Sequence, residues 1–76
     1  MKETLETIIK SLVEFPEQVT VTEVSGEKSI VLEVKVAETD MGKVIGREGK
    51  IAAAIRTVMK ALASKEEKKV SIEFIG

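Results

Sequence analysis

The hydrophobic residues at the start of the chain recur with the period of an α-helix. Apolar side chains are spaced by one to four residues on a single helical face: Leu5, Ile8, Ile9, Leu12 and Val13. This spacing predicts a helix from about residue 2 to residue 14. Pro16 prevents that helix from continuing, because its ring removes a backbone donor and clashes with the preceding turn.

Two segments rich in β-branched residues follow, with a different period. Residues 19–24 read VTVTEV, residues 29–36 read SIVLEVKV, and SGEK connects them. This pattern predicts a β-hairpin. In the second segment every other residue from Ile30 to Val36 is aliphatic, while Glu33 and Lys35 fall on the opposite face, so one face is expected to be buried. The alternation weakens at Glu23 and Val24, where the pattern does not predict a register.

The second half of the chain predicts two helices and a strand. Thr39 or Asp40 is a suitable N-cap for a short helix over 41–45 that ends at Gly46. A longer helix is expected over roughly 50–64, with an apolar stripe made of Ile51, Ile55, Val58, Met59 and Leu62. A third strand over 70–75 places Val70, Ile72 and Phe74 on one side.

The order of these elements is α-β-β-α-α-β. It predicts one α+β domain over residues 1–76, in which three helices cover one face of a three-stranded sheet in two layers. The N-terminal segment is charged and periodic, without the uninterrupted apolar run of a signal peptide or membrane span. We therefore expect a cytoplasmic protein without a membrane partner.

Composition argues against an enzyme. The chain contains no cysteine and no histidine, so it lacks a thiolate nucleophile, a zinc–thiolate site and the commonest general base. Glycine-rich nucleotide motifs also fail, because Val44 stands where both the Walker pattern and GxGxxG need glycine. Ile51 follows Lys50 where the Walker pattern needs serine or threonine. We expect no catalysis, no cofactor and no metal.

The distribution of charge matters more than the net charge of −1. Residues 1–39 carry four lysines against eight glutamates, which gives −4. Residues 40–60 carry five basic residues against Asp40 and Glu48, which gives +3, and residues 61–76 balance. The positive charge is concentrated in one segment, and a local field of this kind steers an anion even when the whole chain is acidic. Arg56 and Lys60 in this segment are interpreted as solvated helix-face residues.

Within the positive segment, residues 44–51 read VIGREGKI and predict a glycine-paired loop between two helices. Glycine allows sharp backbone turns and the close approach of another backbone. A loop at the start of a helix also presents free N–H groups and the positive end of the helix dipole, which suits phosphodiester groups. Gly46 and Gly49 taken alone are better explained by an ordinary turn between helices, and only the flanking pattern and the local charge favour RNA binding.

Residues 40–58, reading DMGKVIGREGKIAAAIRTV, resemble the GxxG signature of KH domains. The element order is similar to the type II KH arrangement, and nearly all 76 residues resemble the small bacterial single-KH-domain RNA-binding proteins of the KhpA-like family. The resemblance implies a protein that holds short single-stranded RNA segments in a groove beside the GxxG loop. It also implies a bacterial post-transcriptional regulator or RNA chaperone.

The resemblance also implies a set of RNA-binding residues. Gly46 and Gly49 would admit the phosphates, Arg47, Lys50 and nearby Lys43 would supply charge, and a strand edge would offer backbone groups to the bases. The apolar floor of the groove would be made of Ile45 and Ile51, although ordinary core packing explains these two nearly as well. Members of the family self-associate and pair with a larger KH-containing RNA-binding protein, so a homodimer or such a heterodimer is expected.

Glu48 departs from the basic or neutral residues usual in the loop of RNA-binding KH domains. A carboxylate beside a phosphate costs on the order of 1 kcal/mol in partly screened water. We therefore expect weak intrinsic affinity for RNA. Phe15 and Phe74 fit core or helix-end positions, so no base-stacking platform is predicted. The alternative function is a dimerising protein-interaction module with weak or vestigial RNA contact.

Overall fold

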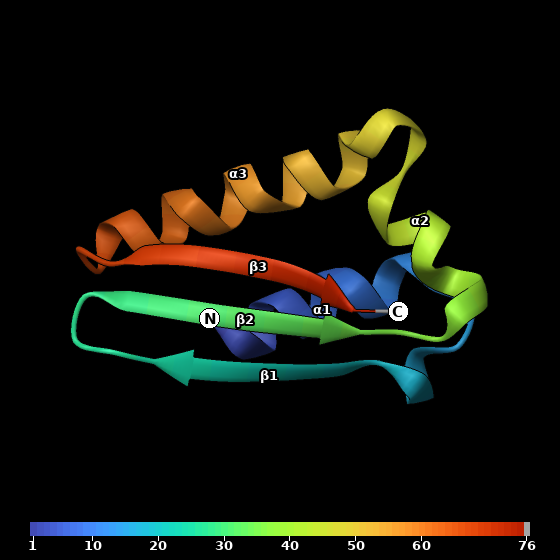
Figure 1. Cartoon of the computed structure of the whole chain (residues 1–76), viewed down its shortest axis with the longest axis horizontal. Helices are drawn as coiled ribbons and strands as arrows, with labels where there is room; N and C mark the ends of the chain where they lie inside the picture. The colour runs from blue at the N-terminus through green and yellow to red at the C-terminus, as the bar shows by residue number, and fades with distance from the viewer. Residues whose placement is uncertain (76) are drawn as a thin grey trace.

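The computed structural model describes residues 1–75 and contains the predicted elements in the predicted order (Figure 1). The helices and strands are α1 (Lys2–Leu12), β1 (Thr20–Ser25), β2 (Ser29–Lys35), α2 (Met41–Ile45), α3 (Lys50–Lys65) and β3 (Lys69–Ile75). Short 3₁₀ turns precede β1 (Pro16–Gln18), precede α2 (Glu38–Asp40) and join α2 to α3 (Arg47–Gly49). None of the helices within residues 1–75 has the length and apolar character needed to cross a membrane.

The three strands form one sheet in the order β1-β2-β3. β1 and β2 are antiparallel, with Val21 opposite Val34, and this register fixes the part of β1 that the sequence pattern left open. β2 and β3 are parallel, with Leu32 opposite Ile72. A parallel pair requires a long crossover connection, which α2 and α3 provide. β3 is therefore an edge strand, and its outer backbone groups are not taken up by another strand.

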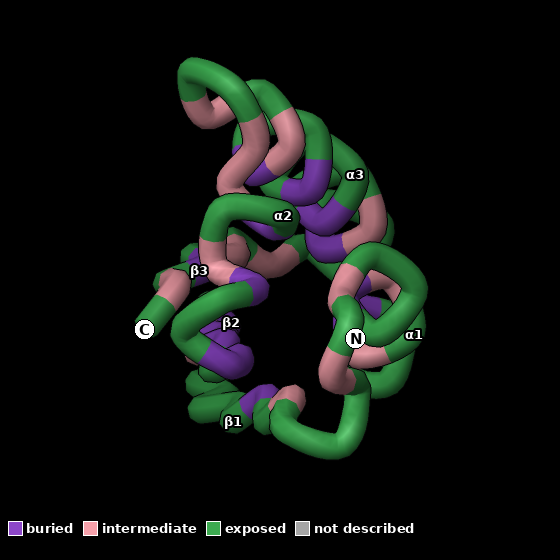
Figure 2. Tube along the Cα trace, turned by 90° about the vertical axis from the view of Figure 1, so that its right-hand side faces the viewer, coloured by how far each residue is buried: buried purple, intermediate pink, exposed green. Residues whose placement is uncertain are grey.

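The core lies between the sheet and the helices (Figure 2). α1 packs against β1, α3 against β3, and α2 against α3. The alternate aliphatic residues of β2 point inward as predicted, and Leu32 and Val34 are completely buried together with Leu5 and Ile9 of α1. The α+β fold with one three-stranded sheet and three helices, predicted from the sequence, is confirmed.

The predicted apolar stripe of α3 is wrong at one position. Val58 is 48% exposed, whereas the buried line along α3 consists of Ala52, Ile55, Met59 and Ala63. The helical spacing of large aliphatic residues pointed to Val58, but the small residues Ala52 and Ala63 lie on the buried side of the helix instead. Val58 therefore faces away from the core.

α1 ends at Leu12, two residues earlier than the sequence predicts. Val13 has extended backbone angles (φ −97°, ψ 159°), so it cannot continue the helix. The backbone N–H groups of the next two residues, Glu14 and Phe15, donate to the side chain of Asp40 instead of to α1. The end of α1 is thus set by a residue distant in sequence as well as by Pro16.

Candidate nucleic-acid interface

The glycine-paired loop lies at the end of the molecule where α2 turns into α3 (Figure 1). α2 ends at Gly46, whose N–H donates to the carbonyl oxygen of Gly42 at 2.9 Å. The loop then closes on itself, because the N–H of Gly49 donates to the carbonyl of Gly46 at 3.2 Å. A compact bend of this kind holds its backbone groups in a fixed position.

Both loop glycines are required by the backbone, for different reasons. Gly46 has φ +77°, and a Cβ there would lie 2.6 Å from Cγ1 of Ile51, which is too close for any side chain. Gly49 has φ +73° with open space around it, so only its backbone angle disfavours other residues. The open space at Gly49 leaves room for another backbone to approach, as the sequence analysis expected of this position.

The start of α3 carries the features that suit an anion. Gly49 occupies the N-cap position and has no side chain to accept from the first-turn N–H groups. The N–H of Lys50 donates to the carbonyl oxygen of Arg47 instead, and the positive end of the dipole of this 16-residue helix points toward the loop, where it favours an external anion. Arg47 and Lys50 flank this position and are both exposed. A phosphate is the common biological anion that fits such a helix start.

The other residues predicted from the sequence lie around this bend. Glu48 is exposed and adopts left-handed backbone angles (φ 57°, ψ 25°), which cost a non-glycine residue about 1–2 kcal/mol. Ile45 and Ile51 are half-buried and pack against the core, so they are core residues that also border the loop. Core packing and a place in the floor of the groove are therefore compatible roles for these two residues.

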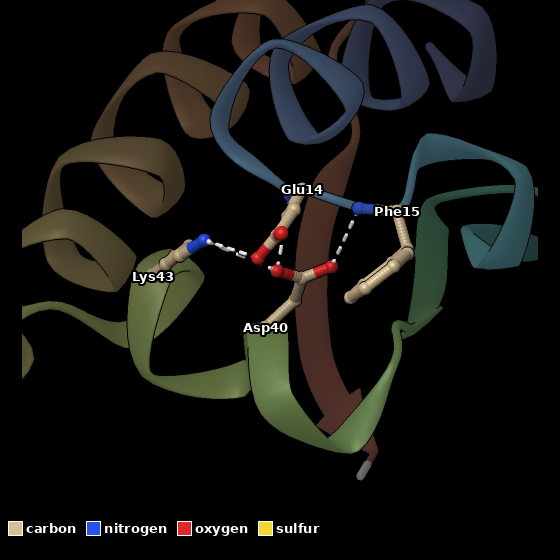
Figure 3. A network of polar contacts seen from close by, with 4 residues as sticks. All are labelled: Glu14, Phe15, Asp40 and Lys43. Atoms are coloured by element: carbon tan, nitrogen blue, oxygen red, sulfur yellow. Dashed lines mark hydrogen bonds and ion pairs between the residues drawn. The ribbon is translucent and has the colours of Figure 1, made fainter.

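Lys43 is not a free cation. Its Nζ lies 3.4 Å from Oε2 of Glu14 and 3.6 Å from Oδ1 of Asp40 (Figure 3). Its side chain is 48% exposed, so an additional anion can still reach it. Any phosphate that binds Lys43 has to compete with two carboxylates, of which Asp40 is close in sequence and Glu14 is 29 residues away.

Asp40 occupies the predicted N-cap position of α2, but its side chain does not cap that helix. Its Oδ1 and Oδ2 accept from the backbone N–H groups of Glu14 (3.0 Å) and Phe15 (2.9 Å), as Figure 3 shows. Burial by itself would raise the pKa of Asp40, but these two hydrogen bonds and the charge of Lys43 hold that pKa below its ordinary value. The carboxylate is therefore ionised at neutral pH inside the protein.

A groove between α3 and β3 extends the interface beyond the loop. Two adjoining hollows of about 250 and about 410 Å³ share Lys60, Val70 and Ser71 and together make this α3–β3 groove. Its remaining lining residues come from the exposed side of α3, from the turn after it and from the edge strand: Arg56, Ser64, Lys68, Lys69, Ile72 and Glu73. Four of the lining residues are cationic.

Arg56 lines the smaller of the two hollows and contacts the edge strand. One of its guanidinium nitrogens donates to the carbonyl of Ile72 at 3.3 Å, and the guanidinium lies 5.2 Å from the ring centre of Phe74. Arg56 is therefore more than a solvated helix-face residue, whereas Lys60 is exposed and only lines the two hollows. Their positions carried a usable signal, because Arg56 follows Gly49 by two helical turns and Lys60 follows Arg56 by one more.

A second surface is apolar. Residues of two helices form a shallow hollow of about 360 Å³, and we call it the α1–α3 apolar face; it comprises Ile8, Leu12, Ile51, Ala54, Ile55 and Val58, bordered by Lys50. Leu12 and Val58 are more than one-third exposed. The face adjoins the loop, because Lys50 and Ile51 belong to both.

The family model and the known proteins that resemble this chain point to the same family. The family model described as "KhpA/KhpB, KH domain" matches residues 2–74. The RNA-binding protein KhpA of Clostridium acetobutylicum is 64% identical over 75 residues, which cover 99% of this chain and 100% of the relative. The RNA-binding protein KhpA of Caldanaerobacter subterraneus subsp. tengcongensis is 55% identical over 75 residues, which cover 99% of this chain and 100% of that relative.

A more distant relative also matches along most of its length. The RNA-binding protein KhpA of Borreliella burgdorferi is 45% identical over 73 residues, which cover 96% of this chain and 89% of the relative. The resemblance predicted from the GxxG loop and the element order is thus confirmed over almost the whole described chain. This protein belongs to the KhpA/KhpB family of KH domains.

Proposed function

We propose that this protein binds short single-stranded RNA, with the sugar–phosphate backbone at the glycine-paired loop and the bases along the α3–β3 groove. The main support for the proposal is that α3 connects the glycine-paired loop to the α3–β3 groove. The loop ends at the free N-terminus of α3, and the same helix then lines the groove with Arg56 and Lys60. The names of the KhpA relatives, which state RNA binding, support the same function.

Each part of the site has a separate role in this proposal. Gly46 and Gly49 let the phosphates approach the backbone N–H groups at the start of α3. Arg47 and Lys50 supply the exposed positive charge, and Lys43 adds to it where phosphate displaces Glu14. The carbonyl of Ile72 on the free edge of β3 offers an acceptor to a base edge, in exchange for Arg56. The guanidinium of Arg56 then offers a planar surface on which a base stacks.

A double substitution in the loop tests the proposal. Arg47→Asp with Lys50→Glu is expected to lower RNA affinity at least about tenfold, because it replaces phosphate-facing cations by anions. Thermal unfolding is expected to stay nearly unchanged, since both side chains are exposed. The affinity is measured by fluorescence anisotropy with a labelled single-stranded oligonucleotide at fixed salt.

A matched control separates this site from a general effect of charge. Lys2→Glu with Lys35→Glu makes the same change in net charge at exposed positions outside the loop and the groove. The control protein is expected to bind RNA about as well as the unsubstituted one. Equal losses in both double variants, or no loss in the loop variant, would rule out the loop as the binding site.

We also propose that the protein self-associates through the α1–α3 apolar face. The face is apolar and exposes Leu12 and Val58, so a second copy that covered it would remove apolar surface from water. A second copy would bring two RNA grooves together, which raises the avidity of a weak site. The alternative occupant is the KH domain of a larger RNA-binding protein, as the combined KhpA/KhpB name of the family suggests.

Val58→Glu tests this second proposal. A carboxylate in the centre of the apolar face is expected to abolish self-association in sedimentation equilibrium, because it would be buried without a partner. Val24→Glu is the matched control, since Val24 is 60% exposed on β1 and outside the face. A monomeric unsubstituted protein would contradict the homodimer, and retained binding to a larger KH protein would then identify the alternative occupant.

The curated relatives are bacterial proteins, and a weak binder of unpaired RNA fits a role in post-transcriptional control or as an RNA chaperone in the bacterial cytoplasm. Recovery of crosslinked RNA from cells tests this role. Defined transcripts are expected to be enriched in the RNA recovered with this protein, compared with the RNA recovered with an unrelated protein of equal abundance. Equal recovery of RNA by the Arg47→Asp, Lys50→Glu variant would contradict it.

A further inference from the structure

Asp40 is completely buried and takes no part in the RNA contacts proposed above. A buried carboxylate is costly unless several groups satisfy it. Asp40 meets this requirement with two backbone N–H donors from the segment after α1 and with Lys43 from α2 (Figure 3). These contacts join two parts of the chain that are 25 and 26 residues apart in sequence.

The position of Asp40 gives these contacts a consequence for the loop. Asp40 immediately precedes α2, and Gly46, the first loop glycine, immediately follows it. α2 has five residues, too few for a helix that holds its own conformation, so its orientation depends on what it is anchored to. Val44 anchors α2 to the core through an apolar contact, and Asp40 anchors its first end through polar contacts.

We infer that Asp40 is a positioning residue for RNA binding: its buried carboxylate fixes α2 against the end of α1 and thereby holds the glycine-paired loop in its binding geometry. The inference rests on the proposed function in one respect, because its affinity test requires that the protein binds RNA. A loop held in place before RNA arrives loses less entropy on binding, so loosening α2 weakens affinity without touching an RNA contact. Conversely, bound RNA must tighten the contacts of Asp40, because coupling between two sites is reciprocal.

Asp40→Asn tests the inference. Asparagine keeps the shape and one acceptor oxygen but turns an NH₂ group toward an N–H donor and removes the charge that pairs with Lys43. RNA affinity is expected to fall by about three- to thirtyfold at a temperature well below unfolding, the usual range for a coupling residue. The amide signals of Gly46 to Gly49 are expected to shift in the RNA-free variant.

A core variant provides the stability control. Ile30→Val removes one buried methylene group at the end of β2 far from the loop, and lowers the unfolding temperature by about 4–8 °C. Its RNA affinity is expected to match that of the unsubstituted protein. Unchanged affinity in Asp40→Asn, or an equal loss in Ile30→Val, would reduce Asp40 to a merely structural residue and overturn the inference.

A measurement on the unsubstituted protein covers the case in which Asp40→Asn does not fold. Single-stranded RNA is expected to slow amide hydrogen exchange at Glu14 and Phe15, which donate to Asp40, but not at Gly26 in the hairpin turn. Unchanged exchange at Glu14 and Phe15 with RNA bound would overturn the inference. If the unsubstituted protein binds no RNA, the proposed function fails instead, and the loop amide shifts in Asp40→Asn still decide whether Asp40 positions the loop.

Discussion

At the scale of single residues, Glu48 combines two unfavourable features in one loop position. Its backbone is left-handed (φ 57°), and it stands in the sequence between Arg47 and Lys50, the two cations that are proposed to face phosphate. The backbone strain is the same for any non-glycine residue, but the charge is specific to glutamate. A lysine at this position therefore changes the electrostatics of the loop and leaves its conformational cost unaltered.

Glu48→Lys is accordingly expected to raise RNA affinity by about three- to tenfold, since it removes a repulsion and adds an attraction, each partly screened by solvent. The unfolding temperature is expected to stay within error of the unsubstituted protein. Fluorescence anisotropy at fixed salt measures the affinity, and Glu48→Gln is the control that removes the repulsion alone. An affinity that falls or does not change in Glu48→Lys would show that position 48 does not face the RNA backbone.

At the scale of elements, sequence periodicity predicts most of this fold because each helix and strand buries one face. The strands and α2 were located to within one or two residues, and the loop glycines were correctly assigned to the bend. The pattern failed where tertiary packing decides. Val58 was assigned to the apolar stripe of α3 by its helical spacing, but it is 48% exposed, whereas Ala52 and Ala63 are buried.

The same limit applies to the site. Local chemistry identified the loop residues, and the pair of Lys43 with Asp40 is local as well, at i, i+3. The contacts of Asp40 with Glu14 and Phe15 and of Lys43 with Glu14 span 25 to 29 residues, and no local pattern reports such pairs. Arg56 was missed for a related reason. Its contact with Ile72 exists only because α3 folds back onto β3, so its place in the groove depends on the crossover rather than on neighbours in sequence.

The junction between α1 and α2 is expected to respond to acid. Because the folded-state pKa of Asp40 lies below its unfolded value, its ionised form stabilises the fold above that unfolded value, about pH 4. This contribution is lost as the pH falls through the lower folded-state pKa. The difference in unfolding temperature between the unsubstituted protein and Asp40→Asn is therefore expected to be largest near pH 7 and to shrink toward pH 3.

Thermal unfolding monitored by circular dichroism at several pH values measures that difference. Lys43 pairs with both Asp40 and Glu14, and both Lys43 and Glu14 are present in the two proteins, so the comparison isolates the charge of Asp40. A difference that stays constant from pH 7 to pH 3 would show that the charge of Asp40 does not stabilise the fold.

At the scale of the whole molecule, the proposed RNA site is small and one-sided. The molecule measures 34 × 23 × 17 Å, and the loop and the α3–β3 groove occupy only one end and one edge of it. KH domains contact about four nucleotides, which limits the number of phosphates that one copy neutralises. The α1–α3 apolar face adjoins the loop without covering the groove, so self-association is compatible with RNA binding and would compensate for the short contact.

The most direct test of the central claim is a titration of the ¹⁵N-labelled protein with a short single-stranded RNA, followed by amide chemical shifts. The account predicts the largest shifts at residues 43–51, smaller shifts along α3 and β3 beside the groove, and little change on the outer face of β1. Shifts confined to the outer face of the sheet, with residues 43–51 unchanged, would contradict it.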